Sequence, residues 1–194
     1  MIPWQFALIA LGAYLLGSVP FGLLLTRLAG LGDIRAIGSG NIGATNVLRT
    51  GRKGLAAVTL LLDAGKGAVA VLLARAIDPY FAAPAMVLVV LGHLFPPWLR
   101  FKGGKGVATA GGAILGLYWP VGLATGALWL LVVLITRLSS LGALLSAGGA
   151  PILTWVLTGD GRASLLVLVI AVLILFRHRG NIARLRRGEE TRIF

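Results

Sequence analysis

Residues 55–77 read LAAVTLLLDAGKGAVAVLLARAI, and this stretch decides the fold class. A helix needs about 20 mostly apolar residues to cross the hydrocarbon core of a bilayer. The stretch is long enough, and it carries charge only at Asp63, Lys66 and Arg75. It therefore predicts a transmembrane helix.

Similar apolar stretches occur along the rest of the chain. Segment 107–118 is the least distinct of them, because it could continue into the next one through Pro120. Several fall short of about 20 residues, so we expect some spans to be short or partly inserted. We predict an all-α membrane protein with about seven transmembrane helices, in a single domain covering residues 1–194. The further spans are expected at residues 2–25, 82–99, 107–118, 121–136, 141–157 and 163–176.

The composition excludes several other classes of protein. Hydrophobic residues make up 58% of the chain and charged residues 12%, whereas a soluble domain is about 25% charged. This excludes a soluble globular enzyme and a disordered chain. The sequence has no cysteine, which excludes disulfides, thiolate catalysis, and cysteine-ligated zinc or iron–sulfur centres.

The basic residues predict an orientation in the membrane. The net charge is +12, but most of it falls on one side if the chain has seven spans. The other side holds only Arg75 and Arg162. By the positive-inside rule, the N-terminus is external and the C-terminus cytoplasmic. The charge then requires no nucleic-acid partner, and because no Lys or Arg precedes Arg27 we expect no cleaved signal peptide. The predicted cytoplasmic Lys and Arg residues lie within residues 27–53, 100–105, 137 and 177–192.

Three predicted cytoplasmic segments are unusually rich in Gly, Asn, Lys and Arg. They are residues 38–49 (GSGNIGATNVLR), 92–109 (GHLFPPWLRFKGGKGVAT) and 178–189 (HRGNIARLRRGE). Glycine-rich loops let backbone N–H groups approach a phosphate, and cationic and amide side chains complete such a site. Residues 103–106 would place this loop at a helix N-terminus. The alternative is a basic loop that lies on anionic lipid headgroups, and composition leaves both open.

Neither glycine motif fits a soluble nucleotide-binding fold. Gly38, Gly40 and Gly43 form a G-x-G-x-x-G pattern, but a membrane helix precedes them instead of the strand that a dinucleotide site requires. Lys105 lacks the Ser or Thr that follows the lysine of a Walker A loop.

Asp63, Lys66 and the two histidines are the remaining candidates for chemistry. Asp63 and Lys66 stand three residues apart on one helix, so they share a face and can pair. Two readings stay open: an ion pair that fixes helix packing, or a lysine that faces a substrate. His93 and His178 each lack an aspartate five residues later, so the His-x4-Asp pair of coenzyme-A-dependent acyltransferases is absent. We predict no metal site.

Together, the three segments resemble the bacterial acyl-phosphate–glycerol-3-phosphate acyltransferases. The family pattern Ser-Gly-Asn-x-Gly-x-Thr-Asn-x-x-Arg matches residues 39–49. Gly-His-x-Phe-Pro matches residues 92–96, and Phe-Lys-Gly-Gly-Lys-x-Val-Ala-Thr matches residues 101–109. Asn-x-x-Arg-Leu-x-x-Gly-x-Glu matches residues 181–190. The motifs fall at the expected places along nearly the whole chain.

The resemblance implies an enzyme of the bacterial inner membrane whose active site lies at the cytoplasmic face. It implies acyl transfer from a fatty acyl phosphate to the 1-hydroxyl of glycerol 3-phosphate, the first step of membrane phospholipid synthesis. The products would be lysophosphatidic acid and phosphate. Neither coenzyme A nor acyl carrier protein would be used directly, no cofactor would be needed, and we expect a monomer in the lipid bilayer.

The motifs supply the candidate site residues. We assign catalytic roles to His93, Lys105 and Asn181. An acyl phosphate is already activated, so direct attack by the glycerol 3-phosphate hydroxyl needs no enzyme nucleophile. A histidine or an oxygen of a substrate phosphate would accept the proton. The predicted substrate-binding residues are Ser39, Asn41, Thr45, Asn46, Arg49, Lys102, Gly103, Gly104, Gly106, Thr109, His178 and Arg184.

A small membrane transporter or channel for an organic or phosphate anion is the alternative function. Basic loops and interrupted helices also suit transport. Transporters, however, commonly show inverted repeats and a midplane site, whereas this sequence shows no repeat and its polar residues gather on one predicted face.

Overall fold

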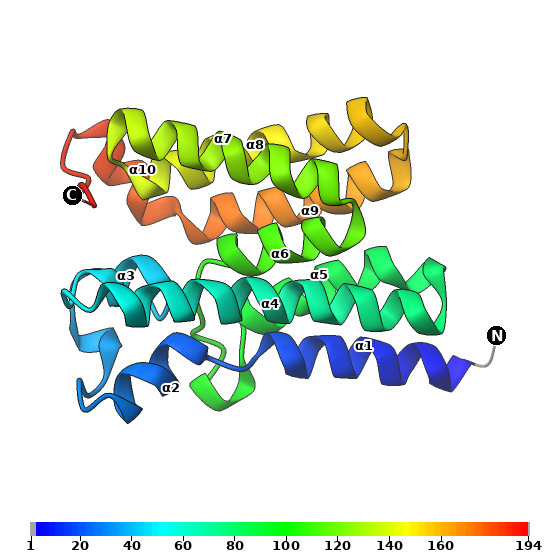
Figure 1. The fold of residues 1–194 in the computed structure, drawn as a ribbon, viewed down its shortest axis with the longest axis horizontal. Helices are drawn as coiled ribbons and strands as arrows, with labels where there is room; N and C mark the ends of the chain where they lie inside the picture. The colour runs from blue at the N-terminus through cyan, green and yellow to red at the C-terminus, as the bar shows by residue number, and fades with distance from the viewer. Residues whose placement is uncertain (1–2, 194) are drawn as a thin grey trace.

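The computed structural model describes residues 3–193, which form helices joined by turns and contain no strand (Figure 1). The all-α prediction is confirmed. Three short 3-10 turns, η1 (Ile34–Ala36), η2 (Pro79–Phe81) and η3 (Pro97–Leu99), lie between helices. The helices are α1 (Pro3–Gly17), α2 (Phe21–Leu28), α3 (Ala44–Leu48), α4 (Lys53–Ile77), α5 (Ala82–Leu94), α6 (Val107–Leu117), α7 (Trp119–Thr136), α8 (Ser139–Thr158), α9 (Gly161–Arg177) and α10 (Arg179–Arg186).

Several helices of the described part are long and apolar enough to cross a membrane. Four pass by length and composition, and six pass if each bent pair of helices counts as one span. The bent pairs are α1 with α2, at 41°, and α9 with α10, at 62°. Helix α6, with 11 residues, is a shorter apolar helix. The prediction of about seven membrane helices, some of them short, agrees with this arrangement.

The first predicted span differs from the structure. The expected first span, 2–25, is not one helix: residue 2 lies outside the described part, α1 ends at Gly17, and α2 begins after Pro20. Proline lacks the N–H that would continue the helical bonding. Segments 107–118 and 121–136, by contrast, form separate helices as predicted, and the alternative of one helix through Pro120 is excluded. Tyr118 adopts an extended conformation (φ −141°, ψ 96°) and separates α6 from α7.

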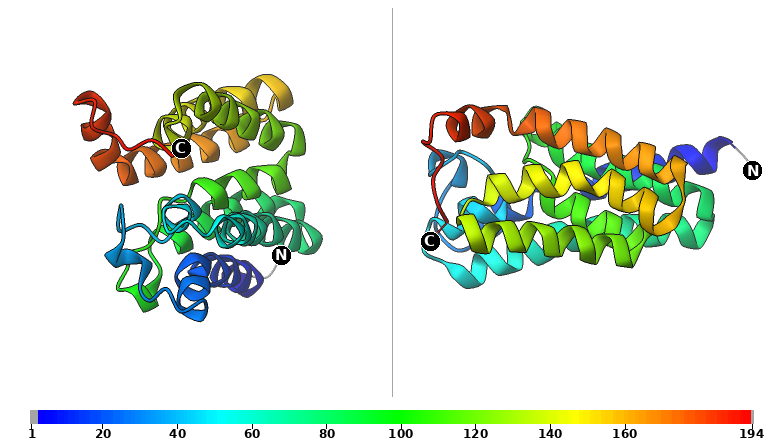
Figure 2. Two further views of the ribbon diagram at one scale, coloured as in Figure 1. Left: turned by 60° about the vertical axis from the view of Figure 1, so that its left-hand side comes forward. Right: turned by 90° about the horizontal axis from the view of Figure 1, so that it is seen from above.

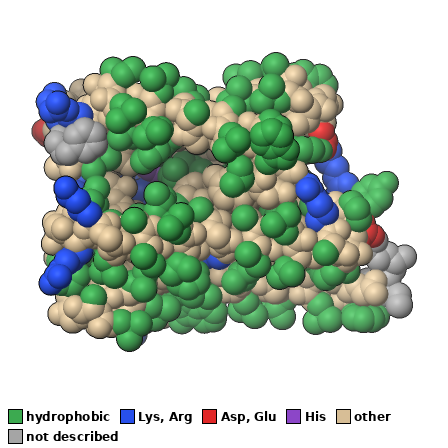
Figure 3. Space-filling view, in the orientation of Figure 1, with side chains coloured by type: hydrophobic (Ala, Val, Ile, Leu, Met, Phe, Trp, Pro, Cys, Tyr) green, Lys and Arg blue, Asp and Glu red, His purple; other side chains and the backbone are tan. Residues whose placement is uncertain are grey.

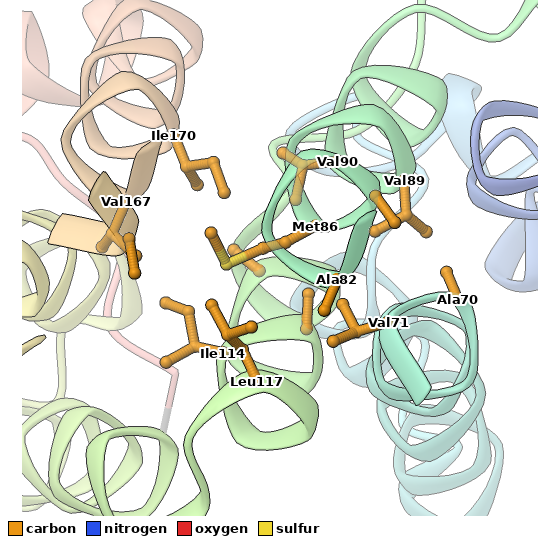
Figure 4. Packing of buried hydrophobic residues seen from close by; sticks show 14 of the residues in the cluster. Ala70, Val71, Ala82, Met86, Val89, Val90, Ile114, Leu117, Val167 and Ile170 are labelled. Atoms are coloured by element: carbon orange, nitrogen blue, oxygen red, sulfur yellow. The ribbon is translucent and has the colours of Figure 1, made fainter. Parts of the chain in front are cut away.

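The helices form two groups. In one, α1 packs on α5, while α5 and α6 both pack on α4; in the other, α8 packs between α7 and α9 (Figures 1 and 2). The core where the groups meet contains Met86 of α5, Ile114 of α6, and Val167 and Ile170 of α9 (Figure 4). Large apolar side chains also cover the outside (Figure 3). Such a surface suits lipid as the surrounding solvent.

One end of the bundle carries the irregular segments. Helix α3, the 3-10 turns η1 and η3, and helix α10 gather there, and we call it the loop end (the left side of Figure 1). The N-terminal half of α1 lies at the opposite end. The three motif-bearing segments therefore meet on one side of the molecule.

Glycine permits the close approach of α4 and α6. A Cβ atom on Gly112 would overlap the carbonyl oxygen of Ala64, and one on Gly67 would overlap the carbonyl oxygen of Thr109. On the adjacent Gly111, a Cβ would meet nothing within 4 Å. Small residues at such positions let membrane helices pack closely.

We predict that Gly112→Ala lowers the thermal unfolding midpoint of the purified protein, because the methyl group forces α4 and α6 apart. Overpacking of this kind costs about 1–3 kcal/mol. Gly111→Ala is the matched control, since both variants gain the same helix propensity, about 1 kcal/mol. Equal midpoints for the two variants would contradict the close-packing interpretation.

Candidate functional site

A cavity of about 430 Å³ lies between the two groups of helices and reaches the loop end. Its wall combines residues of helices α3 to α10 with the loops around them. Figure 3 shows this face of the molecule hollowed between the groups, with Lys and Arg side chains at the loop end. The cavity has a polar end and an apolar part.

The polar end brings the three motif segments together. Predicted site residues from all three line the wall. They are Ser39, Asn41, Thr45, Asn46, Arg49, His93, Lys105, Gly106, His178 and Asn181.

The apolar part extends from this end between the helices. Along α8 the cavity wall runs from Ser139 to Ala150, which at 1.5 Å per residue is about 16 Å. Val167, Ile170 and Ile174 of α9 also line this part. Leu61 of α4, whose surface is 69% exposed, also lines the cavity. The apolar part is therefore adjacent to the outer surface of the bundle.

The loop that carries Lys105 is held on two sides. The N–H of Gly103 donates to the carbonyl of Leu94, and that of Gly104 to the carbonyl of His93, each at 3.1 Å. From α9, the guanidinium of Arg177 donates to the carbonyls of Gly103 (2.6 Å) and Gly104 (3.1 Å).

The conformation of this loop requires glycine at three places, and a Cβ atom on the first, Gly103, would overlap the carbonyl oxygen of His93. A Cβ atom on Gly104 would collide with Nε2 of His93. Gly106, the N-cap of α6, has φ +81°, in the left-handed region that favours glycine. The α6 N-terminus, with its unpaired N–H groups, consequently begins at the cavity wall, where an anion would be stabilised.

Lys105 is part of a chain of hydrogen bonds that crosses the polar end. Its Nζ donates to Oδ1 of Asn181 (2.5 Å), and Nδ2 of Asn181 donates to Glu190 (2.5 Å). Nε of Arg184 donates to the other oxygen of the Glu190 carboxylate at 2.7 Å. A carboxylate thus orients the amide, and the amide orients the lysine.

Burial and neighbouring charges shift the pKa values of Lys105 and Glu190 in this chain of hydrogen bonds. Burial lowers the pKa of Lys105 to about 8; Glu190 opposes the shift, while Arg184, Arg49 and Arg177 add to it. Burial works against ionisation of Glu190, but hydrogen bonds from Asn181 and Arg184 help to outweigh it and keep the pKa below the usual value. At neutral pH the polar end therefore presents a cationic lysine beside an ionised glutamate.

Asn46 organises the first segment. Its Oδ1 accepts from the N–H of Ser39 at 3.0 Å, and its Nδ2 donates to the carbonyls of Ile34, Ile37 and Asn41 at 2.8–3.0 Å. Both polar atoms of this buried side chain thus contact the loop itself. Asn46 fixes the loop shape, which leaves Ser39 and Asn41 facing the cavity.

Thr45 connects the first segment to the other group of helices. Its Oγ1 lies 3.2 Å from Oγ of Ser139, at the start of α8. Arg49 lines the cavity and has an exposed side chain. The arginine therefore stands at the mouth of the polar end.

His178 is a neutral histidine at the cavity wall. Nδ1 donates to the carbonyl of Ile174 at 2.8 Å, which assigns the proton to Nδ1 and leaves Nε2 unprotonated. Burial is the main cause that lowers the pKa of His178 to about 4. The ring is uncharged at neutral pH.

Asp63 and Lys66 form the ion pair that their spacing predicts. Nζ of Lys66 lies 2.7 Å from Oδ1 of Asp63, and both side chains are almost fully buried. Asp63 lines the cavity together with His93, whereas Lys66 lies behind them. The structure therefore favours an ion pair over a lysine that faces a substrate.

Some predicted site residues do not line the cavity. Lys102 lies in a separate surface hollow with Arg27, Arg35, Trp98 and Arg100. Thr109 is fully buried where α6 packs on α4. Gly103 and Gly104 lie behind Lys105 and shape its loop, and Arg184 reaches the site through Glu190.

Sequence reasoning missed two residues of this arrangement. Glu190 belongs to a quoted motif but was given no role, because one carboxylate in a basic segment looks like a solvent-exposed charge. Arg177 was counted only toward the orientation of the chain. Its position at the end of an apolar helix was the available signal, since a cation there commonly reaches a nearby carbonyl.

The comparisons with known proteins agree with this geometry. The profile of the family described as glycerol-3-phosphate acyltransferase matches residues 7–188. A protein of that name from Caulobacter vibrioides is 59% identical over 185 residues, which cover 94% of this chain and 85% of that protein. One from Dinoroseobacter shibae is 55% identical, covering 98% and 94%.

Two solved structures are similar over nearly the whole chain. Both are of PlsY, an integral membrane glycerol 3-phosphate acyltransferase. Its glycerol 3-phosphate form has a TM-score of 0.91 at 37% identity, and its lysophosphatidic acid form 0.89 at 36%. Each comparison covers 97% of this chain and 95% of the other. The chain belongs to the glycerol-3-phosphate acyltransferase family.

Proposed function

We propose that this protein transfers the acyl group of a fatty acyl phosphate to the 1-hydroxyl of glycerol 3-phosphate, releasing lysophosphatidic acid and phosphate. The observation that carries the proposal is the cavity, which joins a polar end containing Lys105, Asn181 and Arg49 to an apolar groove between helices. A long-chain acyl phosphate has the same two parts. The glycerol 3-phosphate and lysophosphatidic acid forms of PlsY support a substrate and a product of this chemistry.

The two parts of the cavity would bind different parts of the substrates. The acyl chain lies in the groove along α8 and α9. The N-terminus of α6 and Lys105 hold the phosphate of the acyl donor, where a cation and free N–H groups face one anion. Arg49 and the amides of the first and third segments hold glycerol 3-phosphate, and Arg184 acts on this part of the site through Glu190.

The reaction needs orientation more than a nucleophile. The hydroxyl oxygen attacks the acyl carbon, the carbonyl oxygen gains negative charge, and the bond to the phosphate oxygen breaks. Lys105 stabilises that charge, and binding both substrates side by side supplies much of the acceleration. The hydroxyl proton passes to an oxygen of a substrate phosphate or to unprotonated Nε2 of His178.

The orientation of the protein in the membrane follows from the distribution of its charged residues. We propose that the loop end faces the cytoplasm of a bacterial inner membrane, because the basic residues gather there. Residues 1–194 form one domain that acts as a monomer, without a cofactor and without direct use of coenzyme A or acyl carrier protein. Its product enters membrane phospholipid synthesis at the first acylation step.

An acylation assay tests the function and separates it from anion transport. Purified protein with synthetic acyl phosphate and radiolabelled glycerol 3-phosphate should form lysophosphatidic acid, whereas acyl-coenzyme A in place of acyl phosphate should give none. The same protein in sealed vesicles should not accumulate glycerol 3-phosphate. Uptake without an acylated product would support the transporter instead.

We expect the pH dependence of kcat/KM to report Lys105. Its charged form is present below a pKa of about 8 and is lost as the pH rises through that value. Activity should therefore fall on the alkaline side, by about tenfold per pH unit. In Lys105→Arg the fall should move to higher pH, because arginine stays protonated. An unchanged alkaline limb in that variant would remove Lys105 from the assignment.

Substitution of Glu190 tests this arrangement, and the same substitution at its neighbour Glu189 is the matched control. Glu190→Gln takes the ionic partner from Arg184 and weakens the orientation of Asn181 and Lys105, so kcat/KM should fall. A lost charge-assisted contact of about 1.5–3 kcal/mol corresponds to about tenfold to a hundredfold. Glu189 pairs with Arg187 at the surface, with both side chains more than half exposed. Glu189→Gln should thus change kcat/KM less than about twofold. Equal losses of kcat/KM in the two variants would contradict the orienting role of Glu190 and would mean that only the local charge matters.

A further inference from the structure

Three acceptors surround the ammonium group of Lys66. Nζ lies 2.7 Å from Oδ1 of Asp63, 2.8 Å from the carbonyl of Val19 and 2.9 Å from Nδ1 of His93. An ammonium has three N–H donors and no acceptor. This buried lysine has hydrogen-bond partners in Val19 and His93 and an ionic partner in Asp63, and His93 must supply a lone pair at Nδ1.

This contact decides which nitrogen of His93 carries the proton. A neutral imidazole with an accepting Nδ1 is protonated at Nε2. The reverse tautomer would place an N–H against the ammonium and leave one lysine donor unpaired. Asp63 does not offer an alternative partner for an Nδ1 proton, because its Oδ1 is 3.7 Å from Nδ1, beyond hydrogen-bond distance.

Nε2 of His93 points toward the loop that carries Lys105. A Cβ built on Gly104 would collide with this nitrogen before any other atom of the ring. His93 also lines the cavity. Among residues 3–193, Nε2 has no hydrogen-bond acceptor, so an N–H group faces the anion-binding loop without a partner. A buried donor in this state gains when an oxygen binds it.

His178 has the opposite arrangement. Its Nδ1 donates to the carbonyl of Ile174, and its Nε2 keeps the lone pair. The two histidines of the chain therefore present different atoms at the same cavity, one a donor and the other an acceptor.

We propose that Lys66 holds His93 in the Nε2–H tautomer, so that His93 donates a hydrogen bond to a substrate phosphate oxygen and does not accept the hydroxyl proton. Lys66 is then a positioning residue that acts through His93, and Asp63 in turn orients Lys66. This inference rests on the proposed function for its ligand, a phosphate, but the tautomer itself can be measured without any turnover.

Nitrogen NMR of the purified protein with ¹⁵N-labelled histidine tests the tautomer. The chain has two histidines, and His93→Gln assigns the signals. We expect protonated Nε2 and unprotonated Nδ1 for His93, and the reverse for His178. A proton on Nδ1 of His93 would overturn the proposal whether or not the protein is active.

Variants at the ion pair separate positioning from a merely structural role. Lys66→Met removes the donor that requires a lone pair at Nδ1, and the carboxylate charge of Asp63, 3.7 Å away, then favours a proton on Nδ1 without accepting a hydrogen bond, so the tautomer should change. Asp63→Asn retains the amine beside Nδ1 and should keep the tautomer. If Lys66→Met does not fold, the ¹⁵N measurement on the unaltered protein still decides which nitrogen of His93 carries the proton. A His93 tautomer that is unchanged in the variant without Lys66 would refute the role of this lysine.

Kinetics of two matched variants test donation to the phosphate. The amide N–H of His93→Gln reaches about the position of Nε2, whereas His93→Leu has no donor. We expect His93→Leu to lose about tenfold to a hundredfold in kcat/KM and His93→Gln to lose several-fold less. A proton acceptor at His93 predicts equal losses in both variants and disappearance of the acidic limb of the pH–rate profile. Product formation by the unaltered protein separates failure of this inference from failure of the proposed function.

Discussion

The guanidinium of Arg177 donates to the carbonyl oxygens of Gly103 and Gly104, and the rest of the site depends on this contact. Arg177 ends α9, which belongs to one group of helices, whereas the glycine loop begins α6, which belongs to the other. The contact therefore holds the two groups in register across the cavity. Because one side chain binds two consecutive carbonyls, it fixes the direction of the loop as well as its position.

Such a site combines a polar environment at one end with an apolar environment along the groove. The polar end gathers cations, amides and the start of a helix where the irregular segments meet. The apolar groove runs on between helices whose outer surfaces are apolar as well. A molecule with a charged head and a long chain can thus enter with each part in its preferred environment, and no domain movement is required to bring the parts together.

Much of the fold followed from hydropathy, because lipid requires long apolar helices and the sequence supplies them. The break after Gly17 was not predicted, since it depends on how Pro20 is accommodated in three dimensions, whereas the separation of α6 from α7 was predicted. Within the site, motif membership placed most residues on the cavity wall.

The exceptions among the site residues have geometric causes. Lys102 and Lys105 are close in sequence, but Arg100 and Phe101 both adopt left-handed conformations. The chain turns sharply there, and Lys102 lies in a different hollow. Glu190 could be recognised as part of the site only once its contacts with Asn181 and Arg184 were seen.

After α10, the N–H of Ile193 bonds to the carbonyl of Arg137 at 2.9 Å, so that Glu190 and Thr191 complete the cavity wall (Figure 2). A preparation clipped by a protease in this tail would keep every membrane helix and its circular dichroism spectrum yet lack a wall of the cavity, so mass spectrometry of the intact chain is the appropriate quality check.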